Sequence, residues 1–262
     1  MTAPTRETRA VAEMLDRAGA PGDGVLFVHS AFRPLGAQGF RAEAFIEGLL
    51  DYMHHGTLVM PTMTWRVVTP ARPWFDERET PSHVGILAER FRLDYASHRS
   101  LHPTHSVAAF GPVADHLTST HHVEDTPCGL TSPYGKARRM AAHIVLLGIG
   151  LERCTAIHHA EEMVAPDIYL SPPEQAETYR CRSRDGTVYQ VRLRRHLRLN
   201  RDFPQFTAPL AEKGALRQGE LAGTRWIAVS QRDLLAEVIG ALERDPRAII
   251  EPPGAPIIPL SP

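Results

Sequence analysis

Cysteine, long apolar runs and an excess of one charge are all scarce in this sequence. Its three cysteines, Cys128, Cys154 and Cys181, are an odd number without the spacing of a metal site, which favours the reducing cytoplasm over a disulfide-stabilised secreted scaffold. No apolar run approaches the roughly 20 residues that a membrane helix needs. The first residues predict an amphipathic helix of mixed charge, unlike a signal peptide. We therefore expect a cytoplasmic protein without a membrane partner.

Positive and negative charges nearly cancel, since 29 Lys and Arg stand against 30 Asp and Glu. The resulting net charge of −1 gives no general attraction to nucleic acid. Residues 178–201 are the exception, because they hold eight arginines and the single acid Asp185. We interpret this arginine-rich segment as a solvated face, or else as a contact for cofactor phosphates, an anionic partner or a second subunit. We expect no nucleic-acid partner, and the sequence leaves a homodimer open.

Motifs that bind nucleotides or metals are also missing. There is no Walker A loop and no complete GxGxxG fingerprint, which disfavours nucleotide hydrolysis and dinucleotide binding. The 14 histidines offer a rival interpretation, a metal site assembled from several of them, but no HExxH or comparable zinc pattern is present. We therefore expect no metal cofactor.

What the sequence does contain is an alternation of short apolar strands and amphipathic helices, which indicates an α/β fold. Strands are expected at Val25–Val28, Thr57–Met60, Ser106–Phe110 and Ile144–Leu147. We predict that these four segments lie in one sheet flanked by helices.

The chain is expected to form a single domain over residues 1–262. Residues 1–165 would form its core, and residues 166–262 a C-terminal lobe of one hairpin and helices packed on that core. Asp185-Gly186, between two segments with strand character, predicts the hairpin. The segment Thr62–Ser82 has no period, and a loop of this length in a compact domain indicates a lid or a pocket wall.

The strongest candidate site follows the strand at Ile144–Leu147, which Gly148 interrupts. His158 and Glu161 stand three residues apart on a predicted helix, so they share a face near the carboxyl end of a strand, where open α/β sheets build their sites. A histidine oriented by a carboxylate can accept a proton near pH 7. The residues alone also allow a capped surface helix with a chance ion pair.

The same segment, TAIHHAE (Thr155–Glu161), resembles the Thr-x-x-His-x-x-Glu segment of the aminoglycoside 3-N-acetyltransferase family. The resemblance runs from about Val25 to about Pro253. Five further segments agree in the family's order, and these are VLFVHSAFRPLG (Val25–Gly36), GTLVMPTMTW (Gly56–Trp65), VGILAERFR (Val84–Arg92), RSLHPTHSVAAFGP (Arg99–Pro112) and TPCGLTSPYGKA (Thr126–Ala137).

The resemblance implies a mixed central sheet flanked by helices, with a hairpin-and-helix lobe at the C-terminus. It also implies acetyl transfer from acetyl-CoA to a primary amine, usually the 3-amino group of a 2-deoxystreptamine aminoglycoside. His158 would be the general base, oriented by Glu161, and the Thr155 hydroxyl is a candidate donor to the tetrahedral oxyanion. His102 resembles a family histidine near the acyl end of the cofactor, where a direct role and a packing role are equally open.

The resemblance also assigns residues to coenzyme A. The loop after the first strand would contact its pyrophosphate and pantetheine, through Ser30, Ala31, Phe32, Arg33, Leu35 and Gly36. Ser106 and Ser132 carry over as further contacts. Family members usually have a second serine where this chain has Ala31, so one hydroxyl contact is absent.

The acceptor amine is predicted to lie between the Thr62–Ser82 segment and the helix of His158. The residues assigned to it are Thr62, Thr64, Trp65, Asp76, Glu77 and Glu162. Acids and arginines cancel within the segment, and it begins with Arg66-Val67-Val68 where family members often carry acids. A different amine from a biosynthetic pathway therefore stays open, and so does a relative that binds coenzyme A or another ligand without turnover.

Overall fold

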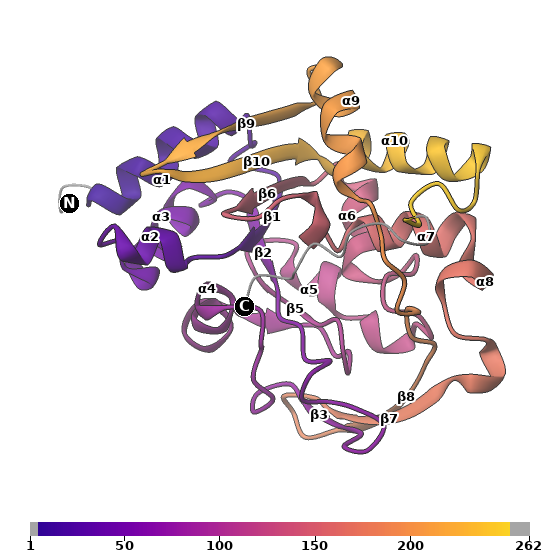
Figure 1. Ribbon diagram of the computed structural model, residues 1–262. Helices are drawn as coiled ribbons and strands as arrows, with labels where there is room; N and C mark the ends of the chain where they lie inside the picture. Colours follow the sequence, from indigo (N-terminus) through magenta and orange to yellow (C-terminus); the bar gives the residue numbers. More distant parts are fainter. Residues whose placement is uncertain (1–4, 252–262) are drawn as a thin grey trace.

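The computed structural model describes residues 5–251 and consists of a large mixed sheet between two layers of helices, with a smaller sheet at one end (Figure 1). The large sheet has seven strands in the order β4-β5-β2-β1-β6-β10-β9. Its strands are β1 (Val25–Ser30), β2 (Thr57–Pro61), β4 (His98–Arg99), β5 (Val107–Phe110), β6 (His143–Leu147), β9 (Leu216–Leu221) and β10 (Thr224–Ser230).

The helices are α1 (Arg6–Ala18), α2 (Arg33–Ala37), α3 (Ala42–Tyr52), α4 (Ile86–Arg90), α5 (Ala114–Thr118), α6 (Pro133–Arg139), α7 (Ile157–Val164), α8 (Pro166–Tyr169), α9 (Thr207–Glu212) and α10 (Gln231–Arg244). A π-helical turn, Phe91–Tyr95, continues α4, and short 3₁₀ turns lie at His121–Val123, Leu151–Arg153, Pro173–Gln175 and Pro204–Phe206. No helix among the described residues is both long and apolar enough to cross a membrane.

The prediction of one sheet from four segments is confirmed, because β1, β2, β5 and β6 all belong to it. β1 lies between β2 and β6 and runs parallel to both, whereas β5 and β10 are antiparallel to their neighbours. The sheet is therefore mixed, and the carboxyl ends of β1, β2 and β6 meet at one edge.

Alternation along the strands builds two cores. Leu26 and Val28 of β1 face α1, α3 and α4, together with Leu58 and Met60 of β2. Phe27 faces the other way, toward α5, α6, α7 and α10. Both faces of the central strands are thus apolar, as is usual where helices cover both sides of a sheet.

The smaller sheet has the order β3-β7-β8 and joins distant parts of the chain (Figure 1). β7 (Glu177–Arg182) and β8 (Val188–Leu193) form the antiparallel hairpin that Asp185-Gly186 predicted. β3 (Trp74–Asp76) comes from the segment Thr62–Ser82 and pairs with β7 in parallel. That long segment is therefore anchored to the hairpin instead of being a free loop.

The residues after 165 contribute to both sheets. The hairpin belongs to the smaller sheet, but β9 and β10 extend the large sheet, where β10 pairs with β6. α10 packs against α7 on the face opposite α1 and α3. This part of the chain is thus divided between both sheets, and it helps to hold the helix that carries His158.

Candidate active site

A cavity of about 960 Å³ opens at the sheet edge where β1 and β6 end. These strands are parallel neighbours in register, with Ser30 opposite Leu147. Gly148 then turns the chain with φ +70°, and a Cβ at this position would lie 2.7 Å from the carbonyl oxygen of Ala31. A glycine is therefore required where the two strand ends approach each other.

The cavity is lined by the ends of these strands, by the start of the Thr62–Ser82 segment and by the first residues of α4 and α7. Its polar and aromatic lining residues are His29, Ser30, Phe32, Arg33, Trp65, Arg66, His83, His105, Glu152, Arg153, Thr155, His158 and Phe203. The segment singled out around His158 thus opens on a cavity large enough for an organic substrate.

His158 and Glu161 share one face of α7, as their spacing predicts. The Nδ1 atom of His158 lies 2.8 Å from Oε2 of Glu161. Glu161 is fully buried and also accepts from Arg201, with Nε 2.7 Å from its Oε1. Burial opposes ionisation of Glu161, but the His158 ring and Arg201 outweigh it and lower the pKa of this carboxyl. An ionised Glu161 fixes Nδ1 of His158 as the donor, which leaves Nε2 as the nitrogen with a free lone pair.

Two rings hold the His158 imidazole in place. His196 stacks on it with the ring centroids 4.3 Å apart and an interplanar angle of 26°. Phe203 meets it edge-on at 5.4 Å. Both rings come from the stretch between β8 and α9, which carries Arg201 as well. This stretch therefore positions the base as much as α7 does.

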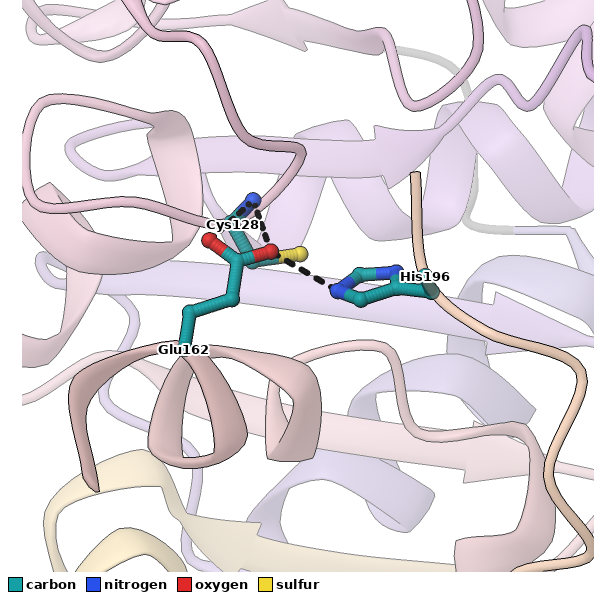
Figure 2. Close-up of side chains that lie close together, drawn as sticks. All are labelled: Cys128, Glu162 and His196. Carbon is teal, nitrogen blue, oxygen red and sulfur yellow. Dashed lines mark hydrogen bonds and ion pairs between the residues drawn. The ribbon is translucent and has the colours of Figure 1, made fainter. Parts of the chain in front are cut away.

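His196 is itself fixed by Glu162, which lies beneath it (Figure 2). Its Nε2 is 2.7 Å from Oε1 of Glu162, and both oxygens of Glu162 accept from the backbone N–H of Cys128 at 2.9 and 3.0 Å. Burial raises the pKa of Glu162 to about 8 and lowers the pKa of His196 well below its usual range. At neutral pH the pair therefore holds one proton on the carboxyl and adds no charge beside His158.

Two groups of side chains come near enough to suggest a metal site, and they share His196. They are Cys128, Glu162 and His196, and His158, Glu161 and His196, with the candidate ligand atoms within 4.8 Å of one another. A metal at Nε2 of His196 would displace its hydrogen bond to Glu162. Burial also raises the pKa of the Cys128 thiol well above its usual range, which disfavours the thiolate that a metal would bind. The hydrogen-bonded arrangement therefore suits these residues better than a metal does.

The predicted coenzyme A loop reaches the cavity in large part. Ser30, Ala31, Phe32, Arg33 and Gly36 line it. Leu35 points into the core between α2 and the sheet and is fully buried.

The other two predicted cofactor serines lie elsewhere. Ser132 is buried and caps α6, accepting from the backbone N–H of Gly135 and donating to the carbonyl of Gly129. Ser106 is buried between β2 and β5, where it donates to the carbonyl of Thr62 and accepts from Nε of Arg99. Neither serine lines the cavity, because both hydroxyls satisfy the protein's own polar groups.

Arg99 organises a buried polar cluster behind the cavity. Its Nη1 donates to the carbonyls of Glu77 and Thr80 at 3.0 and 2.7 Å, and its Nε lies near the Thr62 and Ser106 hydroxyls. Burial lowers the pKa of Arg99 to about 9, so it keeps its charge at neutral pH. Thr62 is thus part of this polar cluster, which holds the Thr62–Ser82 segment in place, and it does not line the cavity.

His102 and Thr64 also serve the protein's own backbone. Nδ1 of His102 accepts from the N–H groups of Thr104 and His105 at 3.2 and 2.9 Å, and its ring stacks on His121. Thr64 is buried and donates to the carbonyl of Pro103. Of the two possibilities for His102, the geometry therefore favours packing, and His105 is the nearby histidine that lines the cavity.

The acids assigned to the acceptor are already paired. Asp76 is buried and accepts from the backbone N–H groups of Arg78 and Glu79 and from Arg182. Glu77 accepts from the backbone N–H of Arg184 at 2.7 Å. Glu162 is held by Cys128 and His196, so Trp65 is the one member of the predicted acceptor set that lines the cavity. The paired acids support the cavity wall instead of facing an acceptor.

Several residues of the site carry no signal in the sequence. Arg201 and His196 lie 40 and 34 residues from the carboxylates that they bind. Most arginines of the arginine-rich segment are exposed, as in a solvated face, and Arg182 and Arg184 also pair with Asp76 and Glu77. Only a known fold could have brought these partners together.

The sequence of this chain matches a known protein family. Residues 27–243 match the family model described as aminoglycoside 3-N-acetyltransferase. The chain belongs to the aminoglycoside 3-N-acetyltransferase family. It is 28% identical to aminoglycoside N(3)-acetyltransferase IV of Salmonella sp over 252 residues, which are 95% of this chain and 91% of the relative. It is 30% identical to aminoglycoside N(3)-acetyltransferase VII of Streptomyces paromomycinus over 178 residues, 61% of each chain.

Solved structures of aminoglycoside acetyltransferases share the fold. A mutant of AAC(3)-IVa in complex with gentamicin aligns with a TM-score of 0.77 and 26% identity, covering 97% of this chain and 94% of that one. The binary complex of AAC-IIIb with CoASH aligns with a TM-score of 0.72 and 20% identity, over 94% and 98% of the two chains. The mixed sheet flanked by helices is therefore the family's fold, and the chain is an acyltransferase.

Proposed function

We propose that the protein transfers the acetyl group of acetyl-CoA to a primary amine, the 3-amino group of a 2-deoxystreptamine aminoglycoside, with His158 as general base. The observation that carries this proposal is the chain of contacts from Arg201 through Glu161 to His158 at the wall of the cavity. An ionised, buried carboxylate next to an imidazole fixes the tautomer of the imidazole. It also stabilises the imidazolium that forms when the ring accepts a proton.

The reaction follows from these contacts. The amine nitrogen attacks the thioester carbonyl carbon, and Nε2 of His158 takes the proton that the nitrogen loses. The imidazolium that forms is stabilised by Glu161 and by the uncharged face of His196. Thr155 lines the cavity beside His158 and is the proposed donor to the oxyanion. Collapse of the intermediate breaks the carbon–sulfur bond, and the coenzyme A thiolate leaves with the proton that the His158 imidazolium gives up, which restores the neutral base.

The donor's phosphates are proposed to lie where β1 and β6 end. Ser30 ends β1, Arg33 follows it, and Arg153 follows β6, so two neighbouring loops offer cations to one phosphate group. Neither arginine has an ion pair within residues 5–251, which leaves both free to bind an anion. Ser106 and Ser132 are not included in this proposal, because their hydroxyls donate to carbonyls of the protein itself.

A cytoplasmic location is proposed from the cysteines. All three are buried and unpaired, which suits a reducing compartment. The aminoglycoside assignment rests on family membership, and aminoglycoside resistance is the activity that it implies.

The test is to mix the protein with acetyl-CoA and a panel of amines, and to titrate the free thiol that appears. Thiol release that depends on an aminoglycoside, with an N-acetylated product of added acetyl mass, supports the proposal. Release with simple amines alone would favour a biosynthetic acceptor. Binding of CoA without thiol release from any amine would indicate a non-catalytic relative.

A further inference from the structure

The cavity is poor in carboxylates, although its family's usual substrates carry several ammonium groups. Glu152 is the one acid among its described lining residues, and its Oε1 accepts from the backbone N–H of Gly150 at 2.8 Å. Asp76 and Glu77 of the Thr62–Ser82 segment, and Glu161 behind His158, all pair with arginines.

Three arginines line the same cavity, and each follows one of three neighbouring strands. Arg33 and Arg153 follow the neighbouring strands β1 and β6, where the donor's phosphates are proposed to bind. Arg66 follows β2 on the Thr62–Ser82 segment, in the part of the wall formed with Trp65 and His83. It is exposed, lies over the Trp65 ring at 5.1 Å from the centroid, and has no ion pair in the described structure.

The neighbours of Arg66 suit an uncharged ligand. His83 stands edge-on to Trp65 with the ring centroids 4.4 Å apart, and neither of its ring nitrogens has a hydrogen-bond partner within residues 5–251. Burial, with a contribution from Arg66, lowers the pKa of His83 to about 4, so this ring is neutral at pH 7. A neutral imidazole and an indole face provide hydrogen bonds and stacking for hydroxyl-bearing sugar rings, whereas a free guanidinium repels ammonium groups.

We propose that Arg66 is a specificity residue that makes the acceptor end select amines of low positive charge, such as amino sugars with few ammonium groups. This inference rests on the proposed acetyl transfer and concerns only which amines are used. It predicts that, in this protein, added positive charge on the acceptor weakens binding instead of strengthening it.

The test compares 2-deoxystreptamine with gentamicin, which carries more amino groups. Initial rates are measured with the wild type and with Arg66→Glu, at low and at physiological ionic strength. For the wild type we expect the lower KM with 2-deoxystreptamine, and a KM for gentamicin that falls as salt screens the repulsion. In Arg66→Glu the KM for gentamicin should fall about tenfold, and salt should then raise it.

Arg72→Glu is the matched control, because it makes the same change of charge on the same segment. Arg72 lies outside the cavity, beside Trp74 and Arg182, and its variant should leave both KM values unchanged. Arg66 makes no hydrogen bond in the described structure, so its variant is expected to fold like the wild type.

Three results would overturn the inference while leaving acetyl transfer intact. They are a gentamicin KM that rises with salt in the wild type, an Arg66→Glu variant with unchanged gentamicin KM, and a rise confined to the KM for acetyl-CoA. The last would assign Arg66 to the cofactor. If no amine is acetylated, the proposed function fails, and calorimetry of gentamicin binding to the CoA-bound protein still decides the inference. Equal affinities in wild type and Arg66→Glu would then refute it.

Discussion

The pair of Glu161 and Arg201 offers the sharpest test of how the site is held together. Glu161 is fully buried, and the Arg201 side chain is 11% exposed. Removing one partner of a buried ion pair costs about 3–5 kcal/mol, because the other charge is left without compensation. Arg201 would keep its bonds to the carbonyls of Leu197 and Leu199 at 3.1 and 3.2 Å, so we expect about 3 kcal/mol for Glu161→Gln.

A double-mutant cycle measures this coupling. Glu161→Gln and Arg201→Met should each lower the free energy of unfolding by about 3 kcal/mol, or the Tm by about 6–12 °C for a chain of this size. The double variant should cost about 1–3 kcal/mol less than the sum. Urea unfolding gives the values, and Lys213→Met, which breaks an exposed pair with Glu237, should cost at most about 1 kcal/mol. Strictly additive losses would refute the claim that Arg201 holds Glu161 in its ionised form.

Two further outcomes follow from the site. Arg33→Ala should raise the KM for acetyl-CoA with little change in kcat, because a phosphate contact is made equally in ground and transition states, and steady-state kinetics with varied acetyl-CoA checks this. In the folded protein the pKa of Glu162 is raised to about 8, so the folded protein binds this proton more tightly than the unfolded chain does. The free energy of unfolding should therefore fall as the pH rises from about 5 to 8. Glu162→Gln should flatten this fall in urea midpoints, and an unchanged slope would contradict the protonated state assigned to Glu162.

Local patterns in the sequence predicted local structure well. The spacing of His158 and Glu161 fixes their contact within one turn of α7, and the amphipathic pattern of the first residues corresponds to α1. β9 was missed because Leu216–Leu221 is an edge strand with mostly polar residues. Sequence periodicity finds strands that bury a face, and this strand buries little of its surface.

The acceptor residues show the limit of that reasoning. Asp76 and Glu77 look available in the sequence, since their segment balances acids and arginines. Their partners Arg182 and Arg184 come from a hairpin more than 100 residues away, so only the folded chain shows that these carboxylates are satisfied. The free charge that this segment brings to the cavity is instead that of Arg66, which in the sequence is only a departure from the family.

The most direct test of the central claim is the turnover of His158→Ala with saturating acetyl-CoA and aminoglycoside. Loss of a general base should lower kcat by ~10²–10⁴ while the Kd for CoA stays the same. His159→Ala is the neighbouring control, because His159 points to the carbonyl of Cys128 and does not line the cavity. Its kcat should be close to that of the wild type. Near wild-type kcat in His158→Ala beside a dead His102→Ala would contradict the assignment of His158 as the base.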